Sequence, residues 1–167
     1  PGICLVTSYA DCVPLYFVDP IKKVIGLSHS GWRGTVGKIG KETVRVMKEH
    51  FGCDPADILA AVGPSICQDC YEVSGDVAEQ FLEKYPQEEA SQIVTEGRVT
   101  DEGEQKYQLD LWAANWFLLK KAGILPEHIH LSGVCTCCNS TLLYSHRASH
   151  GKRGNLNGFI RIREWIR

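Results

Sequence analysis

Residues 10–34, ADCVPLYFVDPIKKVIGLSHSGWRG, decide how the first part of the chain folds. Two apolar runs in this stretch, residues 13–18 and 24–29, have the β-branched and aromatic content of short strands. Asp19-Pro20 lies between them and indicates a turn, because proline presets φ for a turn position. We therefore expect the two strands to be antiparallel neighbours, with the residues at their outer ends close together.

On either side of this stretch, strand patterns alternate with helix patterns. Apolar residues recur at three- and four-residue steps over residues 36–51 and stop at Gly52, which predicts an amphipathic helix. The remaining patterns predict strands over 3–8, 58–62, 129–134, 142–146 and 159–162, helices over 74–84 and 109–122, and a polar surface loop with a short strand over 87–105. Strands in runs with helices between some of them indicate an α+β fold with a mixed sheet.

Length and composition predict a single globular domain over residues 1–167. The chain is 44% hydrophobic and 23% charged, and its formal net charge of -2 argues against nucleic acid binding through bulk positive charge. No apolar run reaches the roughly 20 residues of a membrane-spanning helix, and the first residues do not resemble a secretory signal. Eight cysteines without such a signal favour reduced thiols and a cytoplasmic location. We expect neither a membrane nor a nucleic acid partner.

Two polar segments interrupt the apolar strands and carry the candidate chemistry. Asp11-Cys12 precedes the strand over 13–18, and Ser28 to Gly34 leads from the next strand into a helix start. A thiolate at Cys12 and an imidazole at His29 would form either part of a zinc site or a Cys–His nucleophilic pair. The N–H groups of a helix start, together with the planar fork of Arg33, suit phosphate or carboxylate. A buried structural cysteine and a hydrogen-bonded histidine are the simpler alternatives.

Three further groups of residues are candidate sites. Two C-x-x-C spacings, residues 67–70 and 135–138, lie 65 residues apart, whereas zinc ribbons space their pairs by about 15–20 residues. A second zinc site would need the fold to bring them together, and we favour cysteines without a metal. The H-x-H pair at residues 128–130 has a spacing used by copper proteins, but six histidines in total are too few for a multicopper centre. The basic run over 146–153 is either a solvated loop or a phosphate contact.

Four segments resemble, in order, the signatures of the YfiH-type laccase-domain family: ADCVPLYFVDP, GLSHSGWRGTVGKIGKETV, GPSICQDCYEV and CTCCNSTLLYSHRASHGKRGNLNGFI. The resemblance covers essentially the whole chain, and ADC followed by HxGWRG is highly specific. The family is described both as multicopper polyphenol oxidase and as purine nucleoside phosphorylase. The resemblance implies a YfiH-like fold and a zinc ion held by one cysteine and two histidines, with Cys12 and His29 as two of these ligands. Cys70 and Cys135 resemble cysteines that recur in parts of the family, which favours packing near the pocket.

The resemblance also implies a ligand that these residues do not supply. The family's other histidine ligand lies in a Q-V-H-G motif upstream of ADC, whereas Pro1-Gly2 matches the point just before the ADC strand. We therefore expect the chain to lack the N-terminal portion of the family domain, and the missing segment of the same polypeptide to be a partner of the site. Arg147 matches a family arginine in a segment that usually reads SYRRD, from which His146 and Ala148 depart.

The function that the resemblance implies is zinc-dependent phosphorolysis of purine nucleosides, with adenosine deamination as a second activity. Purine nucleoside and phosphate are then the small-molecule partners, and we expect Arg33, Gly34 and Arg147 to bind phosphate or substrate. Asp11 completes a catalytic set with Cys12, His29 and Arg33.

Several roles and functions stay open at this point. Asp11 would either carry a proton or orient His29. A metal-free Cys–His hydrolase or deamidase would use Cys12 as its nucleophile. Copper-dependent oxidation of polyphenols, with copper in place of zinc, is opposed by the histidine count. A non-catalytic binding module is the fourth possibility.

Overall fold

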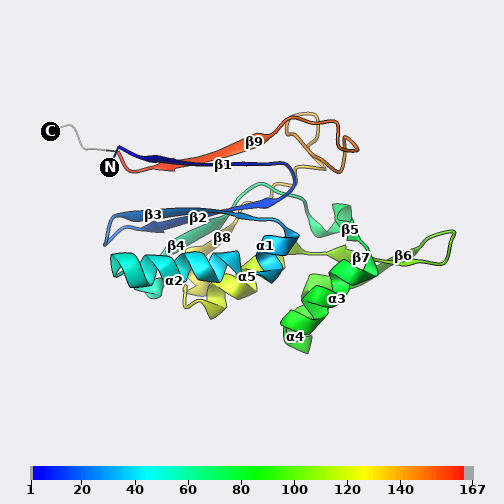
Figure 1. Cartoon of the computed structure of the whole chain (residues 1–167), viewed down its shortest axis with the longest axis horizontal. Coiled ribbons are helices and arrows are strands. Elements are labelled where there is room, and N and C mark those ends of the chain that lie inside the picture. Colours follow the sequence, from blue (N-terminus) through cyan, green and yellow to red (C-terminus); the bar gives the residue numbers. More distant parts are fainter. Residues whose placement is uncertain (1, 164–167) are drawn as a thin grey trace.

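The computed structural model describes residues 2–163, whose strands form three small sheets (Figure 1). The largest sheet has the order β3-β2-β4-β8, a second has the order β5-β7-β6, and β1 pairs with β9. The strands are β1 (Cys4–Tyr9), β2 (Val13–Asp19), β3 (Val24–Ser30), β4 (Leu59–Val62), β5 (Glu72–Val73), β6 (Val94–Val99), β7 (Gln105–Leu109), β8 (Ile129–Leu131) and β9 (Leu156–Arg161). The four-stranded sheet is mixed, because β4 is antiparallel to β2 and parallel to β8. The predicted α+β fold with a mixed sheet is therefore confirmed.

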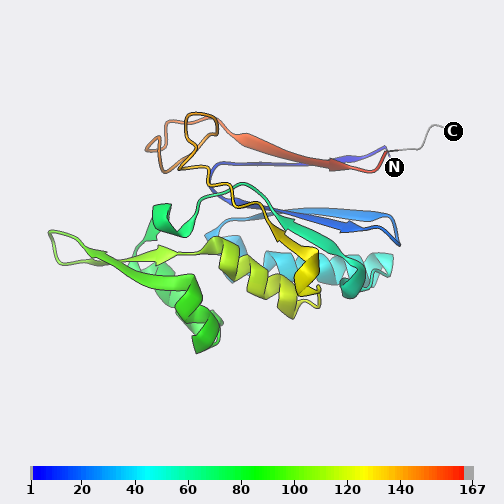
Figure 2. The same ribbon diagram turned by 180° about the vertical axis from the view of Figure 1, so that it is seen from behind.

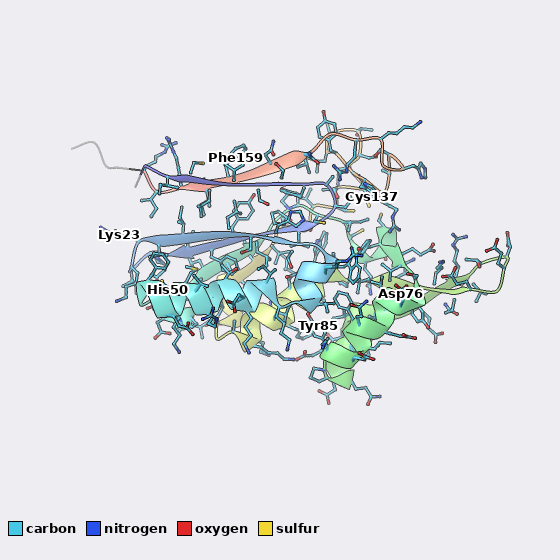
Figure 3. The ribbon with its side chains drawn as sticks, in the orientation of Figure 1. Lys23, His50, Asp76, Tyr85, Cys137 and Phe159 are labelled. Carbon is cyan, nitrogen blue, oxygen red and sulfur yellow. The ribbon has the colours of Figure 1, made fainter. Side chains whose placement is uncertain are left out.

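Helices cover one face of the four-stranded sheet, and the β1–β9 ribbon lies over the other. The helical segments are α1 (Trp32–Val36), α2 (Ile39–Phe51), α3 (Gly75–Lys84), α4 (Gln87–Ile93) and α5 (Leu111–Lys121), with short 3-10 turns at Pro55–Asp57, Gln68–Cys70 and Pro126–His128. Figure 1 and the reverse view in Figure 2 place α2 and α5 beneath the sheet, and α3 and α4 beside the β5-β7-β6 sheet. His50 on α2 and Phe159 on β9 accordingly lie on opposite sides of the four-stranded sheet (Figure 3).

The predicted hairpin at the start of the chain is present and sets the register of the site. β2 and β3 are antiparallel, with Val13 opposite Ser30 and Asp19 opposite Val24. Buried side chains of β2 pack against those of α2 and α5 to form the main core. These core residues include Val13, Leu15, Phe17, Val44, Met47, Leu118 and Leu119. Helix α2 can approach the sheet closely because Gly40 has no side chain: a Cβ there would lie 3.1 Å from Leu15 Cδ1.

Several predicted helices and strands differ from the structure in their bounds. The helix predicted over 36–51 is two helices, α1 and α2, because Lys38 takes a left-handed backbone conformation with φ 59°. Its end at Gly52 is as predicted, since Gly52 supplies the left-handed residue that closes a helix. The segment 87–105, predicted as a loop with a short strand, instead contains α4 and most of a β6–β7 hairpin.

The prediction of a strand over residues 142–146 was wrong. The chain there forms turns, and the N–H groups of Leu142 and Leu143 both donate to the carbonyl of Asn139 rather than to a neighbouring strand. Leu142 is 84% exposed, so the apolar pattern does not mark a buried strand face. The strand predicted over 129–134 ends early, at Leu131. None of the helices described has the length and apolar character needed to cross a bilayer.

Candidate active site

Asp11 lies in the turn between β1 and β2, where it holds distant segments together. Its backbone is left-handed, with φ 74°, and its side chain is buried. Oδ1 accepts a hydrogen bond of 2.7 Å from the Thr136 hydroxyl, and Oδ2 accepts one of 2.7 Å from the backbone N–H of Arg147. The Asp11 carbonyl accepts a further bond of 3.0 Å from the Ile66 N–H. Because both carboxylate oxygens are engaged, the geometry favours a positioning role for Asp11 over that of a proton carrier.

The side chains of Cys12 and His29 border one small space at Gly31. The antiparallel pairing of β2 with β3 places His29 opposite Pro14, two residues after Cys12 in the chain. A Cβ atom on Gly31 would lie 2.8 Å from the Cys12 sulfur and 3.8 Å from His29 Nε2, so glycine keeps this space open. A thiolate and an imidazole are the donors that zinc takes in proteins. Cys12 and His29 therefore supply, beside Gly31, two donor groups of the kinds that a zinc site uses.

The electrostatic surroundings of Cys12 bear on how its thiol can act. Burial raises the pKa of the Cys12 thiol and the Asp11 carboxylate raises it further, while the Arg153 guanidinium acts in the opposite direction. A thiol with a raised pKa is protonated at neutral pH and is a poor nucleophile. Coordination to a metal ion deprotonates a thiol outright. The surroundings therefore disfavour Cys12 as a metal-free nucleophile.

A buried polar network fixes the turn between β3 and α1. The Ser30 hydroxyl donates to Asn115 Oδ1 at 2.8 Å, and Asn115 Nδ2 donates to the Leu111 carbonyl at 2.8 Å. The Thr35 hydroxyl donates to the Gly31 carbonyl at 3.0 Å. Helix α5 thus anchors the segment that carries His29 and Arg33, a role for Asn115 that the sequence did not indicate.

Arg33 and Gly34 lie in α1, immediately after Gly31. The Arg33 side chain is exposed, with its guanidinium carbon 4.2 Å from the centroid of the Trp32 ring. A Cβ on Gly34 would lie 3.1 Å from the His29 carbonyl oxygen, so Gly34 allows α1 to pack against the end of β3. Because α1 has only five residues, the expected anion contact depends on the Arg33 guanidinium rather than on a helix dipole.

Arg147 is anchored by backbone carbonyl groups. Its guanidinium donates to the carbonyls of Cys70, at 3.2 Å, and Glu72, at 2.7 Å, and its central carbon lies 5.3 Å from the Tyr71 ring centroid. Only part of the Arg147 guanidinium is therefore left for the expected contact with phosphate. The main role visible in the structure is to hold the segment from Cys70 to Glu72 against the C-terminal loop.

Tyr71 is the site residue that the sequence reasoning missed. Burial raises the pKa of its hydroxyl to about 12; the charges of Cys12 and Asp11 contribute to the rise, while those of Arg147 and Arg33 oppose it. Tyr71 therefore lies among four of the residues predicted for the site and stays neutral at physiological pH. Only its position within the segment GPSICQDCYEV, which resembles the family, could have indicated Tyr71. An aromatic residue that follows a cysteine pair does not by itself predict a site residue.

Comparisons with known proteins show the family to which the chain belongs. The family model described as "Multi-copper polyphenol oxidoreductase laccase" matches residues 1–163. The chain belongs to this laccase-domain family. It is 38% identical to "Purine nucleoside phosphorylase YlmD" of Bacillus subtilis, over 98% of this chain and 56% of that protein. It is 40% identical to "Adenosine deaminase RL5" of an unknown prokaryotic organism, over 87% of this chain and 53% of that protein.

Solved structures of the laccase-domain family share the fold. The crystal structure of YlmD from Geobacillus stearothermophilus superposes with a TM-score of 0.86 at 39% identity, covering 98% of this chain and 58% of that one. The structure of Bacillus licheniformis YfiH gives the same TM-score at 36% identity, over 95% of this chain and 57% of the other. The YfiH-like fold implied by the sequence is thus confirmed. The chain spans about half the length of the curated relatives it matches.

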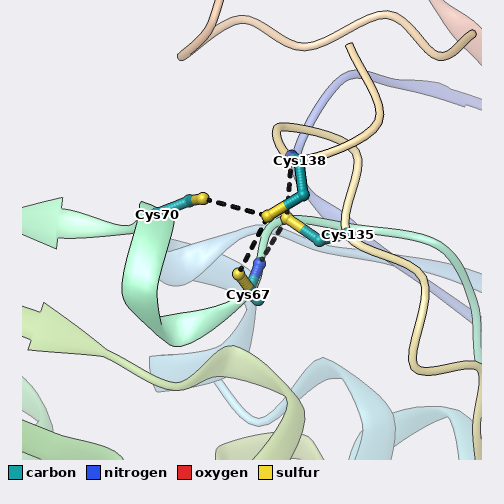
Figure 4. A group of neighbouring side chains, drawn as sticks. All are labelled: Cys67, Cys70, Cys135 and Cys138. Carbon is teal, nitrogen blue, oxygen red and sulfur yellow. Dashed lines mark hydrogen bonds between the residues drawn. The ribbon is translucent and has the colours of Figure 1, made fainter.

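This member of the laccase-domain family also has a four-cysteine cluster, which corrects an expectation from the sequence. The two C-x-x-C pairs converge, and the sulfur atoms of Cys67, Cys70, Cys135 and Cys138 all lie within 4.8 Å of one another (Figure 4). Among residues 2–163, this is the group of three or more potential ligands that could hold a metal ion. The separation of 65 positions from Cys70 to Cys135 did not indicate that the pairs converge, because the convergence depends on the pairing of β4 with β8.

Proposed function

We propose that this chain forms part of the active site of a zinc-dependent purine nucleoside phosphorylase. The observation that carries the proposal is the gathering of Cys12, His29, Arg33 and Tyr71 at one end of the β2–β3 hairpin. Relatives named purine nucleoside phosphorylase align over nearly the whole chain and therefore include this region. Purine nucleoside and phosphate are accordingly the proposed substrates, and the eight free thiols support a cytoplasmic location.

Zinc would be held by Cys12, His29 and a third ligand. We propose that the third ligand is the histidine of a Q-V-H-G segment of the same polypeptide, which the 167 residues do not contain. A zinc ion bound there would supply Lewis-acid chemistry at the reacting centre. Asp11 would keep this arrangement in place by tying the β1–β2 turn to the C-terminal loop through Thr136 and Arg147.

Phosphorolysis needs a cationic group that holds phosphate beside the sugar. A phosphate oxygen forms a bond to C1′ while the bond from C1′ to the purine nitrogen breaks, and the bonding electron pair leaves with the base. Arg33 suits the phosphate because its guanidinium is exposed and close enough to influence Tyr71. Arg147 and Arg153 add positive charge to the same region, since they oppose the rise in the pKa of Tyr71 and of Cys12 respectively.

Adenosine deamination is a second candidate activity, favoured by the similarity to adenosine deaminase RL5. Deamination requires an activated water and no phosphate, so it would share Cys12 and His29 with phosphorolysis but depend less on Arg33. Copper-dependent oxidation of polyphenols is the alternative suggested by the family's description. We disfavour it because the chain has six histidines, too few for a multicopper centre.

Arg33→Lys separates the two proposed activities. Lysine keeps the positive charge but loses the planar fork that binds phosphate through two hydrogen bonds. Losing one charge-assisted hydrogen bond of about 1.5–3 kcal/mol should lower kcat/KM for inosine phosphorolysis roughly 10- to 100-fold. Adenosine deamination should fall by less than about 3-fold, because phosphate takes no part in that reaction.

The matched control for this experiment is Arg45→Lys on α2. Arg45 is exposed like Arg33 but forms ion pairs with Glu42 and Glu49 on its own helix. Both activities should be unchanged in Arg45→Lys. Equal losses of phosphorolysis and deamination in Arg33→Lys would instead assign Arg33 a structural role.

Alkylation of Cys12 tests the metal-free alternative. After zinc has been removed with a chelator, the raised pKa of the Cys12 thiol should make its reaction with iodoacetamide slow at neutral pH. The rate should rise with pH well beyond the ordinary thiol pKa of about 8.5, because only the thiolate reacts. Peptide mapping by mass spectrometry measures this rate, with the exposed Cys4 as the reference thiol. Faster labelling of Cys12 than of Cys4 at neutral pH would support a Cys–His nucleophile instead.

A further inference from the structure

The topology of the four-stranded sheet brings the two C-x-x-C segments together. β4 and β8 are parallel neighbours, so their C-terminal ends lie at the same end of the sheet. The pairing continues past the strand ends as a parallel bridge between Ser65 and Cys135. There the Ser65 N–H donates to the Val134 carbonyl at 3.1 Å, and the Thr136 N–H donates to the Ser65 carbonyl at 3.1 Å. Backbone pairing therefore fixes each cysteine pair opposite the other.

The four sulfur atoms have the spacing of ligands around a single ion. The Cys138 sulfur lies 3.5 Å from that of Cys70 and 4.0 Å from that of Cys67, and no two of the four are more than 4.8 Å apart. A tetrahedral zinc ion with Zn–S bonds of about 2.3 Å separates its sulfur ligands by roughly 3.8 Å. An iron–sulfur cluster contains several metal atoms and would need the sulfur atoms to lie farther apart. The cluster is thus compact enough for a mononuclear site.

Backbone N–H groups point at one sulfur of the cluster. The N–H groups of Cys67 and Cys138 donate to the Cys135 sulfur at 3.3 and 3.4 Å. Hydrogen bonds of this kind stabilise a thiolate and orient it as a ligand. Cys135 is buried, whereas Cys138 is exposed, so an ion could enter from the solvent side.

We propose that Cys67, Cys70, Cys135 and Cys138 bind one structural zinc ion, separate from the zinc at Cys12 and His29. Four protein ligands complete a tetrahedral shell and leave no open position for substrate, which is typical of structural zinc. Four thiolates are also a soft ligand set that selects zinc over magnesium, calcium or manganese. Binding releases the thiol protons, so zinc affinity falls as the pH is lowered.

The position of the cluster gives this zinc a role beside the candidate active site. Cys70 directly precedes Tyr71, and its carbonyl accepts a hydrogen bond from Arg147. Thr136 lies between the cysteines of the second pair and donates to Asp11. Zinc would therefore join two segments that form the surroundings of Asp11 and Tyr71. Binding at the four sulfurs does not depend on the nucleoside chemistry proposed above.

Metal analysis of a set of cysteine variants tests the four-thiolate site. Zinc per chain would be measured by mass spectrometry in the wild-type protein, Cys67→Ser, Cys138→Ser, Cys12→Ser and Cys137→Ser. Cys137 is the matched control, because it adjoins Cys138 in the chain but is not one of the four clustered cysteines. Cys67→Ser and Cys138→Ser should each lose one equivalent of zinc relative to Cys137→Ser and should unfold at a lower temperature. Cys12→Ser should retain this equivalent, which separates the two sites.

A measurement without any substitution in the cluster covers the case in which those variants do not fold. Cys12→Ser would be stripped with a chelator and titrated with Co²⁺, which absorbs in the visible when bound tetrahedrally and shows strong thiolate charge-transfer bands. One equivalent should give this spectrum, and one equivalent of Zn²⁺ should abolish it. The proposal would be overturned if the thiolate bands were absent or if zinc content were unchanged in Cys67→Ser and Cys138→Ser. It would also be overturned by iron in place of zinc, or by a disulfide between Cys70 and Cys138 in freshly purified protein.

Discussion

Gly31→Ala should reduce both phosphorolysis and deamination by at least about 100-fold, because a displacement of about 1 Å at a reacting centre costs that much. The added Cβ would lie 2.8 Å from the Cys12 sulfur and 3.8 Å from His29 Nε2, closer to the sulfur than real Cβ atoms come. Either Cys12 moves or the methyl group fills the space between the two proposed ligands. Both outcomes prevent them from holding one zinc ion.

The backbone should tolerate this substitution, so the effect is confined to the site. Gly31 has φ -69° and ψ 177°, an extended conformation that alanine adopts without strain. Gly75→Ala on α3 is the matched control, since a Cβ there makes an ordinary 3.8 Å contact with Tyr107. Zinc content, kcat and the unfolding midpoint would be compared in the two variants. A Gly31→Ala protein with full zinc and wild-type kcat would show that Cys12 and His29 do not share a metal.

The hairpin at the start of the chain could be predicted because its information is local. Two apolar runs joined at Asp19-Pro20 predict antiparallel strands, and β2 pairs with β3 in that way. The same pairing places Cys12 and His29 on either side of the position where a Gly31 side chain would lie. Helix ends marked by glycine were also readable, as at Gly123, which takes φ 99° just after α5.

Features that depend on long-range pairing could not be predicted from local patterns. β1 pairs with β9, nearly the whole chain away, and no spacing rule indicates this partner. The four-cysteine cluster needs the β4–β8 pairing to bring residues 67–70 and 135–138 together. The apolar segment over 142–146 had the pattern of a strand but lacks a partner strand among residues 2–163.

The role of Asp11 shows the same limit at the level of one side chain. The sequence placed a carboxylate beside Cys12 and allowed it to carry a proton or to orient His29. Thr136 and Arg147, the residues whose groups donate to it, lie more than a hundred positions away. The sequence therefore indicates the charge of Asp11 but not the groups that donate hydrogen bonds to its carboxylate.

Asp11→Ala should lower the free energy of unfolding by about 3–5 kcal/mol, since it leaves one buried and one partly buried donor without acceptors at about 1–3 kcal/mol each and puts alanine in a left-handed conformation. The donors are the Thr136 hydroxyl and the Arg147 N–H, both 2.7 Å from the carboxylate. Urea unfolding would measure the change. Asp101→Ala, in an exposed turn, is the matched control and should change stability by less than about 0.5 kcal/mol.

Asp11→Asn separates positioning from proton transfer. Asparagine tolerates the left-handed backbone and keeps one acceptor oxygen, but its NH₂ group would face either the Thr136 hydroxyl or the Arg147 N–H. The hydroxyl can rotate to accept from the NH₂ group, whereas the backbone N–H cannot. We therefore expect an intermediate loss of about 1–2 kcal/mol, a modest fall in kcat and an unchanged pH dependence of kcat/KM. If Asp11 carries a proton, Asp11→Asn will instead lose most of its activity and one limb of the pH profile.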